Sequence, residues 1–562
     1  MKLLWILGSP TYARNYEGVI RRLAEDGHEL VLASETEGLQ AAGEATLPER
    51  LGAEYPNVRE ERAPAVEEDG WARFRGGIGL ALDALRFHEP PYGEMPFLRK
   101  RAVDRTPPPY ANLLGPVLTG SRRRRAMLRR ALRLAERAVP LHAATTEYVR
   151  RAAPDVMLVT PYVDFATPQS RWIRSARALG VRSCIGVYSW DALTVRGQIR
   201  EVPELVTVWN ATQVADAVAF HHVPPERVVA TGAQAYDHWF DWGPRTAREE
   251  FCARVGLPAD RPYLLYLASS GGYVKHEVAW VIEWMTRLRA EQPALRDVGV
   301  LVRPHPKTKE DWHAVERAGG GPARVWPRQD AHDGLTAQLS DYNVASAAAK
   351  SEFYDSIHHA AAVVGVNTSA LIESAIVGRP VHTFLDPRWR YAQEQTLHFR
   401  QLVEVGGGFL EATDDFAEHA AQVARSVLHP EAVNGRGGTF LRAFIRPDGL
   451  DTPAGPRYVA ALEALAARPA PPPRARTAAE DALALALAPV VAGLARLPQT
   501  PQEWAWASKR RRRRVRRLSG AARKRMRVYD KRARRRVRHL RGALGGRVTR
   551  AAARMARKRP SG

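Results

Sequence analysis

The chain has 562 residues, 45% of them hydrophobic, which is enough for more than one domain with a sizeable core. Its two cysteines, Cys184 and Cys252, make neither a zinc site nor a disulfide framework, and they fit a reducing compartment. The formal net charge is +24, but residues 505–562 alone hold 25 Lys or Arg and one acid, so the rest of the chain is electrically neutral.

The first eight residues, MKLLWILG, predict a β-strand rather than a signal peptide, because the apolar run is short and no small-residue cleavage site follows it. The longest apolar run elsewhere, residues 482–495, is interrupted by Pro489 and is shorter than the ~20 residues that a membrane span needs. We therefore expect a cytoplasmic protein, either soluble or peripheral at the inner face of the cell membrane.

Residues 1–240 alternate between strand and helix patterns, which is typical of a parallel sheet covered by helices. Residues 50–115 have a less clear pattern, and residues 122–137 predict a strongly basic helix. The predicted strands are 3–7, 29–33, 156–160, 183–188, 205–209 and 228–231, and the other predicted helices are 15–26, 169–179 and 212–221.

A second α/β series follows a hinge at residues 236–260. Its predicted strands are 263–267, 298–302, 362–366 and 380–384, and its predicted helices are 277–291, 353–361 and 370–377. Residues 466–480 are dense in Pro and Ala, which is typical of a linker, and the chain beyond residue 509 has few large apolar residues. We expect four parts: residues 1–240 on the acceptor side, 241–465 on the nucleotide-donor side, a linker with a short helix at 466–504, and a disordered or helical basic tail at 505–562.

Ligands of open α/β sheets bind at the carboxyl ends of the strands, where several polar loops occur in this sequence. In the second half, Ser269, Ser270, Gly271 and Gly272 could cradle a phosphate with their backbone amides, although such loops are also common turns. Arg303 and His305 sit in a proline-stiffened turn, where a guanidinium and an imidazole can bind phosphate.

A third loop, Asn367, Thr368 and Ser369, leads into a predicted helix. Glu373 follows Ser369 by four residues, so both lie on one helix face, where the carboxylate could bind ribose hydroxyls behind a diphosphate. An ordinary helix cap with an acid near the helix dipole explains the same residues.

The first half carries the candidates for the acceptor side. Asp191, next to Trp190, could be a general base for an acceptor hydroxyl, and Asp164 is a second candidate; either could instead be a turn or capping residue. Gly8, Ser9 and Arg14 form a strand-to-helix loop on the same side of the first sheet.

The segment 367–381, NTSALIESAIVGRPV, is similar to the donor site of the GT-B superfamily of transferases. The resemblance covers about residues 1–440 and implies two facing Rossmann-like domains. It also implies that Ser369 or Thr368 contacts the donor diphosphate and that Glu373 binds ribose. No metal is implied, because these enzymes typically need none, and the only co-substrate is a nucleotide-activated donor.

Two further segments resemble the branch of CDP-glycerol glycerophosphotransferases and capsule-polymer transferases. The first is Arg303-Pro304-His305-Pro306, whose implied role is to stabilise donor phosphate charge. The second is the run 189–194, SWDALT, followed by 208–210 and 232–237. That branch usually has a histidine where this chain has Asp191, so a sugar transferase with an aspartate base is an equal alternative.

The resulting hypothesis is transfer of a sugar or glycerophosphate-type group from a nucleotide-activated donor to a glycan, polymer or lipid-linked acceptor in cell-surface polysaccharide synthesis. Asp191 and His305 would be catalytic. One alternative is a non-hydrolysing sugar-nucleotide 2-epimerase, which has the same architecture. Another is a polyanion- or nucleic-acid-binding protein, since the tail would bind any polyanion, although we favour an anionic membrane surface.

Overall fold

The computed structural model describes residues 1–37, 45–65, 69–271, 274–306, 308, 310–319, 321–327, 347–432 and 437–495. They form one compact unit that ends at Leu494. The tail predicted at residues 505–562 lies outside the described residues. No helix of the described residues is long and apolar enough to cross a membrane.

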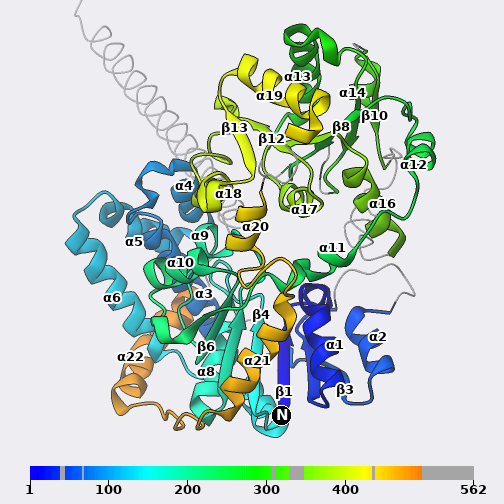
Figure 1. Ribbon diagram of the computed structural model, residues 1–562. Coiled ribbons are helices and arrows are strands. Elements are labelled where there is room, and N and C mark those ends of the chain that lie inside the picture. The colour runs from blue at the N-terminus through cyan, green and yellow to red at the C-terminus, as the bar shows by residue number, and fades with distance from the viewer. Residues whose placement is uncertain are drawn as a thin grey trace, which may run out of the picture. The chain divides into compact units, whose positions relative to one another are not determined.

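The first sheet has seven parallel strands in the order β3-β2-β1-β4-β5-β6-β7 (Figure 1). Its strands are β1 (Lys2–Leu7), β2 (Glu29–Ser34), β3 (Val58–Arg62), β4 (Val156–Thr160), β5 (Arg182–Gly186), β6 (Leu205–Val208) and β7 (Val228–Ala230). The central strands are buried on both faces, as their unbroken apolar runs predict for a parallel sheet. The first six strands in this order, β3-β2-β1-β4-β5-β6, have the strand order of a Rossmann fold.

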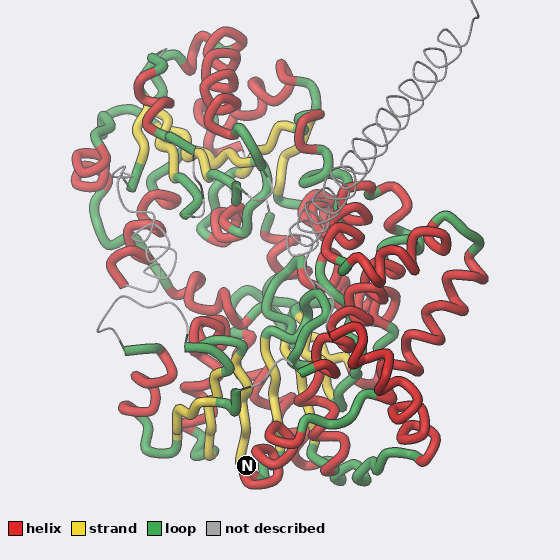
Figure 2. Tube along the Cα trace, turned by 180° about the vertical axis from the view of Figure 1, so that it is seen from behind, coloured by secondary structure: helices red, strands yellow, loops and turns green. Residues whose placement is uncertain are grey.

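Helices occupy both faces of this sheet, as Figure 2 shows. They are α1 (Glu17–Glu25), α2 (Leu47–Glu54), α3 (Gly70–Arg86), α4 (Pro96–Arg105), α5 (Pro108–Leu118), α6 (Arg122–Ala138), α7 (Ala143–Ala152), α8 (Ser170–Leu179), α9 (Ala192–Val195) and α10 (Ala211–His221). Helices α3 to α6 form a separate apolar cluster around Phe87 and Leu98. Most of that cluster falls in the stretch that had no clear sequence pattern.

The second sheet has six parallel strands in the order β10-β9-β8-β11-β12-β13, which repeats the Rossmann order. Its strands are β8 (Tyr263–Leu267), β9 (Gly299–Arg303), β10 (Ala323–Val325), β11 (Ala362–Gly365), β12 (Val381–Phe384) and β13 (Leu410–Thr413). The helices of this half are α12 (Arg248–Val255), α13 (Glu277–Glu291), α14 (His313–Arg317), α16 (Ala347–His358), α17 (Ala370–Ile376), α18 (Leu397–Glu404), α19 (Phe416–Leu428) and α20 (Gly438–Phe444). The predicted fold class is thereby confirmed: α/β with two Rossmann-like domains, as the GT-B resemblance implies.

The chain crosses from the first half to the second through α11 (Asp237–Asp241) and later returns. Helix α21 (Ala454–Ala467) packs against α1 and the first sheet (Figure 1). Its Tyr458 and Leu462 share a core with Trp5. Asp237 accepts hydrogen bonds from the Ala454 and Gly455 amides at 2.9 and 2.8 Å, which fixes the start of α21.

The chain after α21 lies against the first half. The Arg182 Nε donates to the Arg468 carbonyl at 2.8 Å, and the Arg474 amide donates to the Arg177 carbonyl at 3.0 Å. Helix α22 (Ala478–Ala495) follows and has Pro489 inside it. The predicted linker at 466–504 is thus in contact with the first half as far as this helix, whereas the domain boundaries stay a prediction.

Candidate functional site

The residues predicted for the site follow the carboxyl ends of strands in both sheets. In the first sheet, Gly8 follows β1, Asp164 follows β4, and Trp190 and Asp191 follow β5. In the second, Ser269 follows β8, Arg303 ends β9, and Asn367 follows β11. Because parallel strands all end at the same edge, each sheet brings its loops together.

One hydrogen bond connects the loops of the two halves. The indole Nε1 of Trp190 donates to the Ser369 Oγ at 3.0 Å, and Trp190 is 5% exposed. Ser369 is the residue before α17, so a residue predicted for the acceptor side contacts the start of the predicted donor helix. The indole ring also meets the His398 ring of α18 edge-on, with 4.8 Å between the centroids.

Glu373 lies one turn inside α17 and is half-buried. Burial raises the pKa of its carboxyl to about 7, and the positive charge of Arg14, in the 3-10 helix Pro10–Tyr16 of the first half, opposes that rise. Tyr236 is buried nearby: burial raises the pKa of its hydroxyl, and the charges of Glu373 and Asp191 raise it further. The predicted base and the predicted ribose ligand therefore both lie within electrostatic range of one tyrosine.

Asp191 directly precedes α9 and caps no amide with its side chain. Its carboxylate accepts a hydrogen bond from the Ser189 hydroxyl. The imidazole of His398 is close: burial lowers its pKa to about 4, and the negative charge of Asp191 opposes that fall. His398 is 6% exposed, and among the residues that the structure describes its Nδ1 has no hydrogen-bond partner.

Sequence reasoning did not select His398, and Tyr236 entered it only as part of the run 232–237, without a role. His398 lies inside α18, far along the chain from any strand-end motif, and only packing brings it beside Trp190 and Asn367. The Asn367 Nδ2 lies 3.5 Å from the His398 Nε2 and donates to the Ala392 carbonyl.

The loop after β8 is held by internal hydrogen bonds. The Ser269 Oγ accepts from the Asn367 amide at 3.2 Å, and the Ser269 amide donates to the two carboxylate oxygens of Glu277 at 3.1 and 3.0 Å. Burial raises the pKa of Glu277 to about 8. The Ser269 amide is thus occupied by a carboxylate of the chain itself. Ser270 and Gly271 continue the loop, and Gly272 lies outside the described residues.

Arg303 is held near α16. Its guanidinium is 3.6 Å from the Glu352 carboxylate and 5.1 Å from the centre of the Phe353 ring, and burial lowers its pKa. Its Nη1 is buried and has no hydrogen bond to the described parts of the chain. His305 is half-buried in the turn that follows, where its carbonyl accepts from the Thr308 amide at 2.9 Å. Thr368 is half-buried next to Ser369, and its carbonyl accepts from the Leu371 amide in the first turn of α17.

The remaining acceptor-side candidates have structural partners. A Cβ on Gly8 would stand 2.8 Å from the Pro161 ring, so the close approach of these two loops requires glycine. The Ser9 hydroxyl is 2.6 Å from the Thr11 hydroxyl. Asp164 forms an ion pair with Arg196 at 3.6 Å.

No group of three or more His, Cys, Asp or Glu side chains in the described parts of the chain could hold a metal ion. Whether the reaction needs a metal is a separate question, and metal independence stays a prediction from the resemblance.

Solved structures that are similar to this chain share little sequence with it. A UDP-GlcNAc 2-epimerase from Methanocaldococcus jannaschii is 13% identical, with a TM-score of 0.44 over 83% of this chain and 100% of the epimerase. A glycosyltransferase from Rickettsia africae is 9% identical, with a TM-score of 0.45 over 84% and 99% of the two chains. MurG from Acinetobacter baumannii is 11% identical, with a TM-score of 0.39 over 82% and 99%. No protein-family model and no curated protein matches the sequence, so evidence about function comes from the residues of this chain.

Proposed function

We propose that this chain transfers a group from a nucleotide-activated donor to an acceptor hydroxyl, in the space between the strand-end loops of its two halves. The observation that carries the proposal is the contact between the loop that bears Asp191 in the first half and the start of α17, the helix that bears Glu373 in the second half; the charges of both carboxylates also act on the buried Tyr236. The Trp190–Ser369 hydrogen bond holds the two loops at this point.

The donor half would bind the nucleotide along α17. The start of this helix offers backbone amides and the dipole of its first turn to a diphosphate. Glu373 would accept hydrogen bonds from the ribose hydroxyls, and the nearby charge of Arg14 favours its ionised form. Arg303, His305 and the amides of the β8 loop beyond Ser269 would stabilise charge on the departing phosphate.

The acceptor half would supply the base. Asp191 would take the proton of the acceptor hydroxyl as the oxygen forms its new bond to the transferred group, while the bond to the nucleotide phosphate breaks. An imidazole with a pKa near 4 is neutral at physiological pH, so we give His398 no charge to contribute. Its role would be to position this site by packing against Trp190.

The test is a thermal-shift panel of UDP, CDP, CMP, GDP and ADP, with NAD as a control, on the full chain. A ligand at ~100 times its dissociation constant should stabilise the fold by about 2.7 kcal/mol. We expect one nucleotide to raise the melting temperature of the wild type. The same nucleotide should leave the melting temperature of Glu373→Ala unchanged. The matched control is Glu291→Ala, which removes an exposed glutamate from the end of α13 and should keep the full shift.

The responding nucleotide then separates the finer hypotheses. CDP or CMP would favour the glycerophosphotransferase and capsule-polymer branch, and UDP or GDP a sugar transferase. Turnover of the donor without any acceptor would indicate the epimerase instead. If no nucleotide at millimolar concentration changes the melting temperature, the proposal fails.

A further inference from the structure

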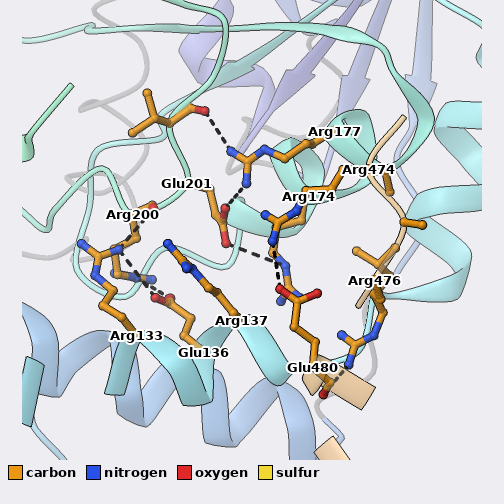
Figure 3. A pocket seen from close by; sticks show the side chains of 14 residues that line it. Arg133, Glu136, Arg137, Arg174, Arg177, Arg200, Glu201, Arg474, Arg476 and Glu480 are labelled. Carbon is orange, nitrogen blue, oxygen red and sulfur yellow. Dashed lines mark hydrogen bonds and ion pairs between the residues drawn. The ribbon is translucent and has the colours of Figure 1, made fainter. Parts of the chain in front are cut away.

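We propose a second binding site, away from the strand-end loops, for a small phosphate-bearing anion. It is a cavity of about 340 Å³ (Figure 3), a size in the range of small-molecule sites. Its walls come from α6, α8, the chain just before β6 and the segment that leads into α22. The lining residues are Arg133, Glu136, Arg137, Leu141, Arg174, Arg177, Ala178, Arg200, Glu201, Val202, Arg474, Ala475, Arg476 and Glu480.

The cavity is separate from the candidate active site because it lies toward the other end of the first sheet. Arg177 is near the last residue of α8, shortly before β5 begins, and Glu201 comes shortly before β6 begins. These positions belong to the amino ends of the strands. Asp191 and the other acceptor-side candidates follow the carboxyl ends.

The lining has a surplus of positive charge, with seven arginines against three glutamates. Two of the glutamates are each shared by two guanidinium groups. Glu136 is 2.7 Å from Arg200 and 3.8 Å from Arg133, and Glu201 is 2.6 Å from Arg177 and 3.8 Å from Arg174. Asp83 pairs with Arg200 at 3.7 Å and Asp481 pairs with Arg476 at 2.6 Å, so seven guanidinium groups face five carboxylates in and around the cavity, which leaves a smaller surplus of positive charge.

Unsatisfied hydrogen-bond donors point to the same conclusion. The side chain of Arg174 is 10% exposed, yet within the described residues its Nη1 is buried without a hydrogen-bond partner, whereas the Nη1 of Arg200 is 3.7 Å from the Asp83 carboxylate. An unmade hydrogen bond of a buried charged group is costly, so buried donors in a native structure normally have a partner. Phosphate oxygens suit several guanidinium groups at once, because each guanidinium can donate two parallel hydrogen bonds.

Arg137 offers the clearest test of this site. It lines the cavity from α6, and in Figure 3 its guanidinium lies between those of Arg200 and Arg174. Within the described part of the chain it takes part in no hydrogen bond or ion pair of its own. Replacing it should therefore leave the fold intact and remove one charge from the site.

The experiment is calorimetric titration of the full chain with inorganic pyrophosphate at about 0.15 M salt, where the screening length is ~8 Å and weak surface attraction is reduced. We expect Arg137→Gln to weaken binding about tenfold, the effect of losing one charge-assisted hydrogen bond. The matched control is Arg130→Gln, which removes the same charge from an exposed position of the same helix and should bind as the wild type does. The basic residues 505–562 are identical in both variants.

Three results would overturn the proposal. The first is equal weakening by Arg137→Gln and Arg130→Gln, which would indicate general attraction to a basic chain. The second is no binding of pyrophosphate by the wild type. The third is tighter binding of citrate than of pyrophosphate, which would contradict phosphate as the ligand class. If Arg137→Gln is misfolded by circular dichroism, Arg474→Gln, whose side chain is 48% exposed, replaces it in the same comparison.

This site and the proposed function can fail independently. Arg137→Gln should keep the melting-temperature response to the active nucleotide, because no residue of the strand-end loops is changed. If Arg137→Gln loses both the melting-temperature response and the binding of pyrophosphate, both ligands share one site, and the proposal of a second site is overturned.

Discussion

Glu373 is the residue whose protonation should be visible in solution. Its pKa is about 7 in the folded chain against an ordinary value of 4.5, mainly because of burial. Between these two pH values the folded state holds a proton that the unfolded state has lost. The stability that Glu373 contributes is therefore complete below about pH 4.5 and is lost as the pH rises through 7.

The wild type should accordingly lose stability relative to Glu373→Gln between pH 5 and pH 8. We expect a difference of ~2 kcal/mol, seen as a change of a few degrees in the gap between the two melting temperatures. Arg14→Gln removes the charge that opposes the shift, so the loss should be larger than in the wild type and should extend to higher pH. If the melting temperatures of the wild type and Glu373→Gln change with pH in parallel, the carboxyl of Glu373 does not titrate in this range.

At the scale of elements, α18 connects the second half to the first. Its Gln401 Nε2 donates to the Asp216 carboxylate of α10 at 2.9 Å, and both side chains are 8% exposed. Burial raises the pKa of Asp216 to about 6, and this hydrogen bond opposes the rise. The same helix carries His398, so the contact also holds one wall of the candidate active site.

We predict that Gln401→Ala destabilises the protein more at pH 8 than at pH 5. At pH 8 the variant leaves an ionised carboxylate buried without its donor, at a cost of about 2 kcal/mol, whereas at pH 5 the carboxyl is mostly protonated. Chemical denaturation at the two pH values measures the difference. In the Asp216→Asn background the same substitution should lose its pH dependence; a dependence that persists there would assign it to another group.

The sequence predicted elements well where both faces of a strand are buried. Strands β1, β4, β8, β9 and β11 are continuous apolar runs, which mark them directly. Strand β3 was missed because it is the edge of its sheet: its sequence is VREER, and only Val58 is buried. Helices α3 to α5 were missed because they pack on one another outside the alternating α/β pattern.

The candidate site was predictable only as far as strand ends could be located. Parallel strands place Trp190, Asp191, Asn367 and Ser369 at sheet edges, and the sequence suffices for that. The contacts of Trp190 with Ser369 and His398 depend on how the second half packs on the first, which no local pattern encodes. Likewise, nothing in the loop 269–272 indicated that Glu277 would occupy the Ser269 amide.

At the scale of the whole molecule, the compact unit formed by the described residues ends at Leu494. We predict that a chain shortened after residue 495 keeps the wild-type melting temperature and the nucleotide response. It should lose binding to anionic vesicles measured by co-sedimentation, since the basic surplus lies in residues 505–562 and each basic residue near such a surface contributes about 1 kcal/mol.

Shortening after residue 465 gives a contrasting control. It removes the contacts of Arg468, Arg474 and Arg476 with the first half, so a lower melting temperature is expected. Unchanged vesicle binding by the chain that ends at residue 495 would place the membrane-binding charge elsewhere, and no vesicle binding by the full chain would exclude an anionic membrane as a partner.

The return of α21 to the first sheet has a mechanical consequence. The chain passes between the halves twice, once through α11 and once between α20 and α21. The hydrogen bonds from the Ala454 and Gly455 amides to the Asp237 carboxylate hold the second connection against the first. A body attached at a single point can swivel in any direction, whereas one attached at two points can turn only about the line between them. Any opening between the strand-end loops of the two halves should therefore follow a single rotational coordinate, along which Trp190 and Ser369 separate.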